Sequence, residues 1–279
     1  MTDDLSATPS SPTPRPTWER DLVRHLAFAA VQEQRRARRW GIFFKLLGFC
    51  YLFAILGLWI ISEQDGRAFH LSSGKHTALV KINGVIADGT EANAEDVITG
   101  LQDAFDDNNT QGVILRINSP GGSPVQAAYI NDEITRLRKE HPTIPFYVVI
   151  SDLCASGGYY IAVAGQKIYA NPGSIVGSIG VRMDAFGFVE AINKLGIERR
   201  LLTAGEHKGL LDSFLPERPE EVAHTKTLLA NIHSQFIMAV KKGRGSRLAD
   251  QPELFSGLVW TGEQAKELGL IDDFGSTDY

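Results

Sequence analysis

Two short glycine-rich stretches of the sequence carry residue types that could do acyl-transfer chemistry. NSPGGS covers residues 118–123, and CASGGYY covers residues 154–160. Each contains a Gly-Gly pair between an apolar, strand-like run and a helix-like run. Backbone amides are free to donate at such a position, and the helix dipole favours negative charge. An acyl-transfer enzyme needs two such amides for its oxyanion, and one of them usually follows the nucleophile directly.

The serine in the second stretch, Ser156, is therefore the candidate nucleophile. Its neighbour Gly157 supplies one oxyanion amide, and the second comes from Gly122 or, with a poorer fit to the pattern, from Gly121. Both Gly-Gly pairs also fit ordinary strand-to-helix turns, with the serine as a helix cap, or a phosphate cradle. The phosphate interpretation lacks the lysine of a GxxxxGK[ST] loop and any GxGxxG pattern.

A nucleophilic serine needs a base, and the residues alone leave two neighbours open. His207 and Lys208 lie side by side in TAGEHKGLLDSF, residues 203–214. Histidine is a common general base. A lysine can serve where burial lowers the pKa of its amine, although most lysines are solvated. From residue type alone, His207 and Lys208 are therefore equally good candidates for the general base.

Alternating strand-like and helix-like segments must position these residues. Strands are expected at 77–86, 112–118, 144–151 and 167–170, and helices at 91–107, 123–140 and 156–164. Ser123 is a candidate N-cap, and Pro124 suits the first helical position. Elements that alternate in this way predict an α/β domain with parallel strands, in which the loops after the carboxyl ends of the strands build the site.

The N-terminal part of the chain predicts a membrane anchor. Residues 1–17, rich in Ser, Thr and Pro, are expected to form a disordered cytoplasmic tail. Residues 18–39 have helical spacing and end in RRARR, which favours a basic juxtamembrane helix on anionic lipid over a merely solvated helix. Residues 40–62 are apolar apart from Lys45 and are long enough for one transmembrane helix.

Charge sets the expected orientation of that anchor. Residues 1–62 carry a formal charge of +3 and the remainder carries −8. Arginines before the apolar run place the tail in the cytoplasm and the residues after 62 outside. A linker at 63–76 then leads to a domain at 77–279, whose acidic balance disfavours nucleic acid as a partner. A cleavable signal peptide fits poorly, because the apolar run starts late and no small-residue cleavage site follows.

Four sequence blocks together resemble the signal peptide peptidase A family of membrane-anchored serine–lysine peptidases. They are LRINSPGGSP, ASGGYYIAVAGQKIYANPGSIVGSIGV, AGEHKGLLDSF and LVWTGEQAKELGLIDDFGS, in family order over residues 77–275. The resemblance implies a crotonase/Clp-like superhelix of ββα units, here preceded by a single transmembrane helix. The INSPGG turn is also similar to the Clp proteolytic subunit, but the MEH histidine block of that family is missing.

The resemblance also implies roles for single residues. Ser156 matches the nucleophile, and Lys208 matches the general base, so His207 becomes a neighbour that faces elsewhere. Ser178 matches a serine whose hydroxyl orients the lysine amine, and Gly122 and Gly157 match the oxyanion donors. No cofactor or metal is implied, and the two distant cysteines give neither a disulfide framework nor a metal site.

The function implied is that of a serine endopeptidase. It would degrade signal-peptide remnants and other unstructured apolar peptides at the outer, periplasmic face of the bacterial cytoplasmic membrane. The resemblance further implies a ring-shaped homo-oligomer, in which short members take the serine and the lysine of one site from neighbouring subunits. Two rivals stay open: a crotonase-like acyl-CoA enzyme, which the anchor disfavours, and a non-enzymatic scaffold, which needs neither the serine nor the lysine.

Overall fold

A computed structural model gives the fold and describes residues 35–36, 38–57 and 74–277. The expected tail, most of the expected juxtamembrane helix and most of the expected linker lie outside these residues. The chain divides into two compact units, residues 1–71 and 72–279, and each is considered by itself.

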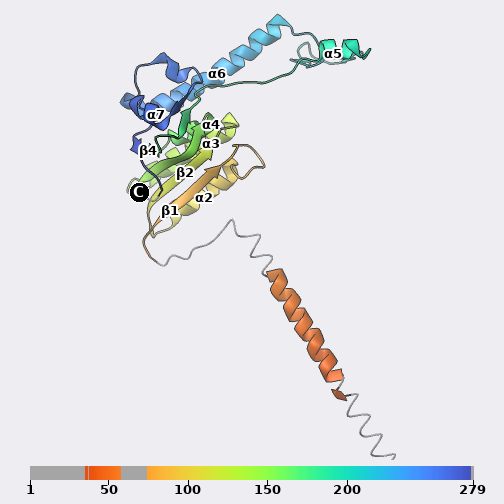
Figure 1. The fold of residues 1–279 in the computed structure, drawn as a ribbon, viewed down its shortest axis with the longest axis vertical. Coiled ribbons are helices and arrows are strands. Elements are labelled where there is room, and N and C mark those ends of the chain that lie inside the picture. The colour runs from red at the N-terminus through yellow and green to blue at the C-terminus, as the bar shows by residue number, and fades with distance from the viewer. Residues whose placement is uncertain (1–34, 37, 58–73, 278–279) are drawn as a thin grey trace, which may run out of the picture. The chain divides into compact units, whose positions relative to one another are not determined.

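The described part of the first unit is an apolar helix. Residues Arg38–Gly57 form 20 helical residues with a mean hydropathy of 1.8, and none of that apolar stretch is buried (Figure 1). Trp40 near its start stacks on Phe44 with 5.6 Å between ring centroids. The helix is long and apolar enough to cross a hydrocarbon core. Among the described residues it is the one helix with this character, as the sequence predicts.

The second unit is built on a mostly parallel sheet, which confirms the predicted fold class. Its strands are β1 (His76–Asn83), β2 (Thr110–Ser119), β3 (Phe146–Ala155), β4 (Lys167–Ala170), β5 (Ile175–Gly177), β6 (Val259–Thr261) and β7 (Asp273–Phe274). The order β1-β2-β3-β4-β7 is parallel throughout. β5 pairs in parallel with the end of β3, and β6 pairs antiparallel with β5.

Two differences from the predicted strands affect the site. β1 ends at Asn83 because Gly84 takes a left-handed φ of 81°, and Ile86 then makes an isolated bridge to Gly122. β3 continues past residue 151 to Ala155, because its last residues pair with β5. β5 and β6 could not be predicted from the sequence, since strands of three residues are too short to show periodicity.

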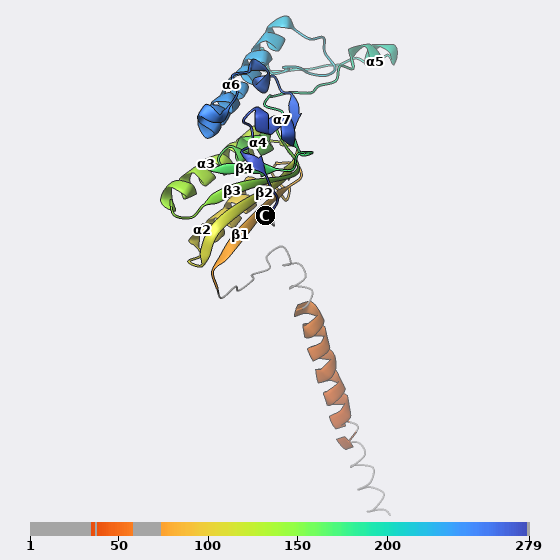
Figure 2. The same cartoon turned by 60° about the vertical axis from the view of Figure 1, so that its left-hand side comes forward.

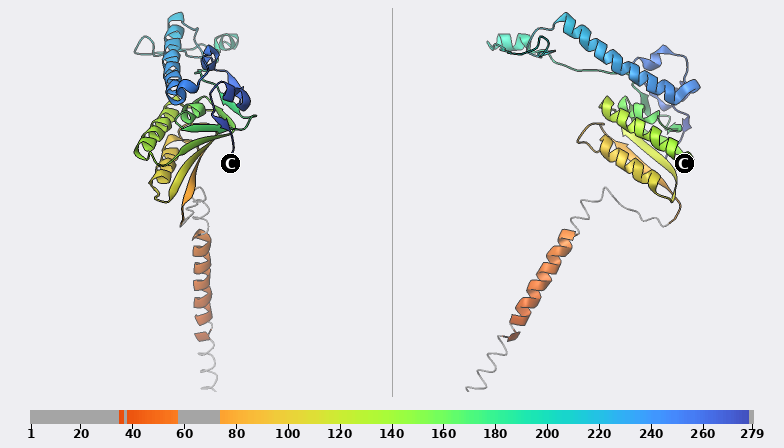
Figure 3. Two further views of the ribbon diagram at one scale, coloured as in Figure 1. Left: turned by 90° about the vertical axis from the view of Figure 1, so that its left-hand side faces the viewer. Right: turned by 180° about the vertical axis from the view of Figure 1, so that it is seen from behind.

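The helices of this unit are α2 (Ala94–Asp106), α3 (Pro124–Glu140), α4 (Gly157–Ala162), α5 (Val189–Lys194), α6 (Pro219–Arg244) and α7 (Gly262–Glu267). Helices α2 and α3 cover one face of the sheet (Figure 3). Alternate residues of β2, namely Val113, Leu115 and Ile117, are buried beneath them. The predicted start of α3 is confirmed, because the Ser123 side chain accepts from the Gln126 amide and Pro124 is the first helical residue.

Between β5 and α6 the chain leaves the sheet. We call residues 182–217 the arm; it contains α5 and extends with the N-terminal half of α6 away from α3 and α4 (Figures 1 and 2). Several of its large apolar side chains face solvent, among them Phe186, Leu195 and Leu202, at 76%, 73% and 96% exposure. An exposed apolar surface of this kind is typical of contact with another molecule.

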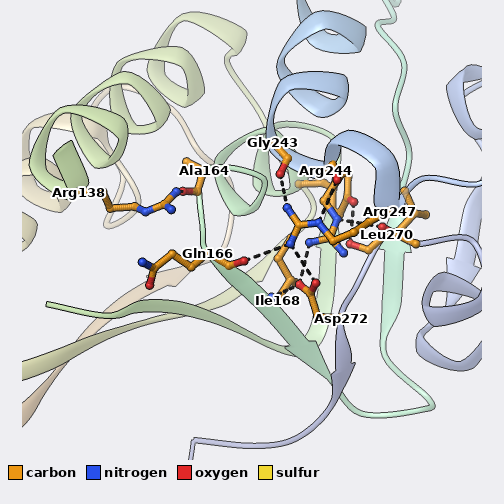
Figure 4. A network of polar contacts seen from close by, with 11 residues as sticks. Arg138, Ala164, Gln166, Ile168, Gly243, Arg244, Arg247, Leu270 and Asp272 are labelled. Atoms are coloured by element: carbon orange, nitrogen blue, oxygen red, sulfur yellow. Dashed lines mark hydrogen bonds and ion pairs between the residues drawn. The ribbon is translucent and has the colours of Figure 1, made fainter. Parts of the chain in front are cut away.

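A buried ion-pair network fastens the C-terminal segment to the sheet. Arg244 is 2% exposed, and its Nη1 lies 2.7 Å from Asp272 Oδ2, while Arg247 Nη1 lies 3.0 Å from Oδ1 (Figure 4). Oδ2 also accepts from the Ile168 amide in β4 at 2.7 Å. Burial alone would raise the pKa of Asp272, but these hydrogen bonds outweigh it and hold that pKa below its usual value.

We expect Asp272→Ala to lower the free energy of unfolding by about 3–5 kcal/mol, because it leaves the Arg244 guanidinium buried without its carboxylate. The matched control is Asp273→Ala, which removes an exposed partner of Lys266 and should change little. Urea unfolding of the full chain in detergent, followed by tryptophan fluorescence, measures both. Equal losses in the two variants would contradict this assignment.

Candidate active site

Ser156 lies at the sharp turn between β3 and α4. Its φ of 52° and ψ of −124° form a backbone conformation that a serine rarely adopts, and it is held by hydrogen bonds on both sides. Its amide donates to the Gly177 carbonyl at 2.8 Å, and its carbonyl accepts from the Tyr160 amide at 2.9 Å. The hydroxyl does not cap α4, although Ser156 occupies the cap position. The helix-cap interpretation is therefore wrong.

The two Gly-Gly turns face each other at very short range. A Cβ built on Gly121 would lie 2.7 Å from the Ser156 Cβ and 2.6 Å from the Gly157 nitrogen. A Cβ on Gly157 would lie 3.3 Å from the Gly122 nitrogen. Only residues without side chains permit this approach. The two turns therefore bring the amides of Gly122 and Gly157 to the side of Ser156.

Hydrogen bonding distinguishes between the two candidates for the second oxyanion donor. The Gly121 amide donates to Ser119 Oγ at 3.1 Å. The amides of Gly122 and Gly157 donate to no group in the part of the chain that the structure describes. Free amides are what an oxyanion hole requires, so this geometry favours Gly122 over Gly121.

Residues after β1 support the first turn from behind. The Ile86 amide donates to the Gly121 carbonyl at 2.9 Å, and the Ser123 amide donates to the Ile86 carbonyl at 2.7 Å. A Cβ on Gly122, where φ is 154°, would lie 2.0 Å from that Ile86 oxygen. Glycine is therefore required at this position by contact as well as by backbone conformation.

Strand pairing places Ser178 beside Ser156. Ala155 and Gly177 are register partners of β3 and β5, so each serine directly follows a paired residue. The φ of Ser178 is 51°, nearly the same as that of Ser156, and its amide donates to the Leu258 carbonyl at 2.7 Å. Within the described residues, neither serine hydroxyl makes a hydrogen bond. Two free hydroxyls thus stand at the ends of adjacent strands.

Trp260 in β6 borders this pair and was not singled out in the sequence. Its Cδ1 would lie 3.0 Å from a Cβ on Gly177, so the indole ring packs against the glycine between the two serines. Its indole nitrogen is buried without a hydrogen-bond partner among the described residues. The block LVWTGEQAKELGLIDDFGS contains this residue, but only the pairing of β6 with β5 shows where it lies.

Buried side chains hold α4 and the turn beneath it. The Tyr159 hydroxyl, fully buried, donates to the Leu270 carbonyl at 2.7 Å. Asn131 of α3 donates to the Tyr160 carbonyl at 2.7 Å. Cys154 lies under the turn, and burial raises the pKa of its thiol, which disfavours the reactive thiolate. Cys154 therefore packs beneath the site, and the nucleophile candidate is the half-buried Ser156.

The two candidate bases lie elsewhere, in the arm. Lys208 is exposed, its amide closes a turn on the Gly205 carbonyl at 3.2 Å, and its side chain has no polar partner in the described part of the chain. His207 Nδ1 lies 3.4 Å from Arg218 Nη2 and 3.6 Å from Glu221 Oε1. The segment between α5 and α6 that carries both residues lies away from α4 in each view (Figures 1, 2 and 3).

One chain therefore brings together Ser156, Ser178, Gly122 and Gly157, but not Lys208. A cavity of about 790 Å³ lies between the arm and the first half of α6, in the region that carries Lys208. Met183, Phe186, Arg199 and Leu229 are among its lining residues, whereas Ser156, Ser178, Gly122 and Gly157 are not. Within the described residues, no group of three or more His, Cys, Asp or Glu side chains is placed to hold a metal ion.

Comparison with known proteins shows which family the chain belongs to. Residues 138–279, about half of the chain, match the model of "Peptidase family S49". The chain belongs to this family. Membership is consistent with the resemblance carried by the four sequence blocks. The matched residues include Ser156, Ser178 and Lys208, but not the first Gly-Gly turn.

Relatives extend the similarity toward the N-terminus. The chain is 31% identical over 215 residues to "Putative signal peptide peptidase SppA" of Enterococcus faecium, covering 74% of this chain and 62% of that protein. It is 30% identical over 220 residues to "Protease 4" of Haemophilus influenzae, covering 77% and 35%. It is 50% identical over 175 residues to "Na(+)/H(+) antiporter NhaA" of Brucella melitensis, covering 63% of this chain but 24% of that protein. The chain thus spans about a quarter of this last relative, whose name describes the longer protein.

Proposed function

We propose that this chain is a membrane-anchored serine endopeptidase that uses Ser156 as nucleophile and Lys208 as general base. One observation carries the proposal: Ser156 stands at a strained turn with an unbonded hydroxyl, beside the two free amides of Gly122 and Gly157. This is the arrangement of a nucleophile and an oxyanion hole. Membership of a peptidase family supports hydrolysis of peptide bonds as the reaction.

The chemistry follows from these groups. The neutral Lys208 amine takes the Ser156 proton as Oγ attacks the peptide carbonyl, and the Gly122 and Gly157 amides donate to the oxyanion that forms. The lysine then gives its proton to the leaving amine, and water releases the acyl-enzyme. In this proposal the Ser178 hydroxyl, which makes no hydrogen bond among the described residues, orients the lysine amine.

We expect Ser156→Ala and Lys208→Ala each to lower kcat by at least about 10³-fold on a fluorogenic peptide with an apolar residue before the scissile bond. Ser178→Ala should lower it by about 10–100-fold, as loss of an orienting group does. His207→Ala, the matched neighbour, should retain activity. Hydrolysis of the peptide is measured with the whole chain in detergent. A serine-directed phosphonate is used in parallel to test whether Ser156 is labelled. Full activity of Ser156→Ala would refute Ser156 as the nucleophile, and the absence of both cleavage and labelling would favour a crotonase-like acyl-CoA enzyme.

We further propose that Lys208 acts on Ser156 of a neighbouring subunit in a ring-shaped homo-oligomer. Two observations support this. The hydrogen bonds of the turn that carries Lys208 join it to the rest of the arm and to the first turn of α6, with none to the elements around Ser156. The arm also exposes large apolar side chains, for which a second copy is a natural cover. The isolated chain is then incomplete as a catalyst.

Mixed oligomers test this sharing of the site. Inactive Ser156→Ala chains supply Lys208, and inactive Lys208→Ala chains supply Ser156, so co-assembly should restore about a quarter of wild-type activity when pairing is random and each interface holds one site. Ser156→Ala chains mixed with a double Ser156→Ala/Lys208→Ala variant are the control and should stay inactive. Assembled mixtures with no activity at all would place the dyad within one subunit.

We propose that the substrates are signal-peptide remnants and other unstructured apolar peptides at the outer face of the bacterial cytoplasmic membrane. Support comes from the apolar helix 38–57, the arginines before it, and the name of the Enterococcus faecium relative. A helix that anchors the enzyme keeps it where such peptides leave the bilayer.

The orientation is measured by chemical labelling of intact cells. A chain with Cys50 and Cys154 replaced by alanine and with Gln251→Cys, an exposed position of the catalytic unit, should react with a membrane-impermeant maleimide once the outer membrane is opened. A Ser6→Cys chain should react only after lysis. The reverse pattern would place the catalytic unit in the cytoplasm.

A further inference from the structure

Glu221, the third residue of α6, is an unusual residue of the arm region. It is the one acidic side chain among the buried residues of the described chain, with 5% of the side chain exposed. A buried carboxylate is destabilising unless charged or polar partners satisfy it. The carboxylate is satisfied by Arg218 and by two residues of the turn that carries Lys208, His207 and Leu211. The buried charge therefore connects α6 to this turn.

Glu221 and Arg218 hold this turn on both sides of Lys208. After Lys208, the Leu211 amide donates to Glu221 Oε2 at 3.4 Å. Before it, Arg218 Nη2 donates to the Glu206 carbonyl at 3.1 Å and lies 3.4 Å from His207 Nδ1. Arg218 and Glu221 are themselves joined by an ion pair and a hydrogen bond. The pair thus clamps the backbone from residue 206 to residue 211.

The held turn has a conformation that would not persist without support. Leu211 takes a φ of 53°, a left-handed conformation that is unfavourable for leucine. The amide of Leu211 donates the hydrogen bond that Glu221 Oε2 accepts. The hydrogen bond from Arg218 also holds the pKa of Glu221 below its usual value, so the carboxylate stays charged at neutral pH and the clamp stays formed.

Lys208 itself has no polar partner in the described part of the chain, so the backbone of its turn alone directs its side chain. A general base must be oriented closely, and a misplacement of about 1 Å can cost about 10²-fold in rate. We propose that Glu221 is a positioning residue that, together with Arg218, fixes the turn from which Lys208 reaches the serine. This inference rests on the role given to Lys208 above.

One other assignment fits the same contacts and is distinguishable. A carboxylate near Nδ1 of a histidine is the relation found in Ser-His-Asp triads, in which the histidine is the base. Glu221 Oε1 lies 3.6 Å from His207 Nδ1, but Arg218 lies closer to that nitrogen and occupies the same carboxylate oxygen. This competition favours the clamp over a triad.

The experiment compares Glu221→Ala, Glu221→Gln and a control, Glu220→Ala, in full-length assembled protein. Glu220 is the neighbouring residue, exposed, with Arg218 as its ion-pair partner at 3.7 Å. We expect Glu221→Ala to lower kcat about 30–100-fold with KM changed less than about threefold, since the turn orients the base without binding substrate. Glu221→Gln keeps an oxygen for the Leu211 amide and should lose about 5–10-fold. Glu220→Ala should match wild type.

Mixed oligomers add a readout that a general structural role would not produce. In one mixture, Glu221→Ala is introduced into the Ser156→Ala chain, which supplies Lys208. This mixture should no longer regain activity when combined with the Lys208→Ala chain. In the other mixture, Glu221→Ala is introduced into the Lys208→Ala chain, which supplies Ser156. This mixture should regain as much activity as the original pair of chains. Equal losses from both placements would make Glu221 a structural residue and overturn the inference.

The outcomes separate this inference from the proposed function. Wild-type kcat for Glu221→Ala, with Lys208→Ala inactive, overturns the positioning role and leaves the peptidase proposal standing. If Lys208→Ala is active while His207→Ala and Glu221→Ala are inactive, His207 is the base. This result overturns the positioning role of Glu221 and the role of Lys208 as general base. If Glu221→Ala does not assemble, the Gln variant decides, and an assembled Gln variant with wild-type kcat overturns the inference.

Discussion

The close approach of two backbone turns is the constraint on which the candidate site depends. Gly121 and Gly122 pass so near to Ser156 and Gly157 that no side chain fits between them. Among the described residues, the amides of Gly122 and Gly157 have no acceptor, and the Ser156 hydroxyl makes no hydrogen bond to the helix that it precedes. The strain at Ser156 is met by an ordinary sheet hydrogen bond to Gly177. The sheet therefore maintains an unfavourable local conformation at the candidate nucleophile.

The sequence predicted well those features that depend on local pattern. The apolar run, the alternation of strands and helices, and the cap at Ser123 all follow from residues close together in the chain, and the structure confirms them. The two Gly-Gly stretches were predicted to meet because parallel strands end at one edge of a sheet. They do meet, with Gly122 as the free donor.

The remaining features depend on contacts between residues distant in sequence. β5 and β6 have three residues each, and only their pairing shows that Ser178 stands beside Ser156 and that Trp260 borders both. Glu221 follows a proline at a helix start, where acidic residues are common for electrostatic reasons. Its pattern therefore gave no sign that it would be buried against the Leu211 amide. The separation of Lys208 from the serine also has no local signal, because it follows from the course of the arm.

The pairing of β5 with β6 has a consequence for the order in which the chain is made. Ser178 is held on one side by the Leu258 carbonyl, and Tyr159, three residues after Ser156, is held by the carbonyl of Leu270. Both carbonyls come much later in the sequence than the residues they hold, Leu270 by 111 positions. A growing polypeptide therefore contains Ser156 before the segments that hold its surroundings have been made. The turn around Ser156 therefore reaches its folded conformation only after residues 258–270 have been synthesised and have packed against the sheet.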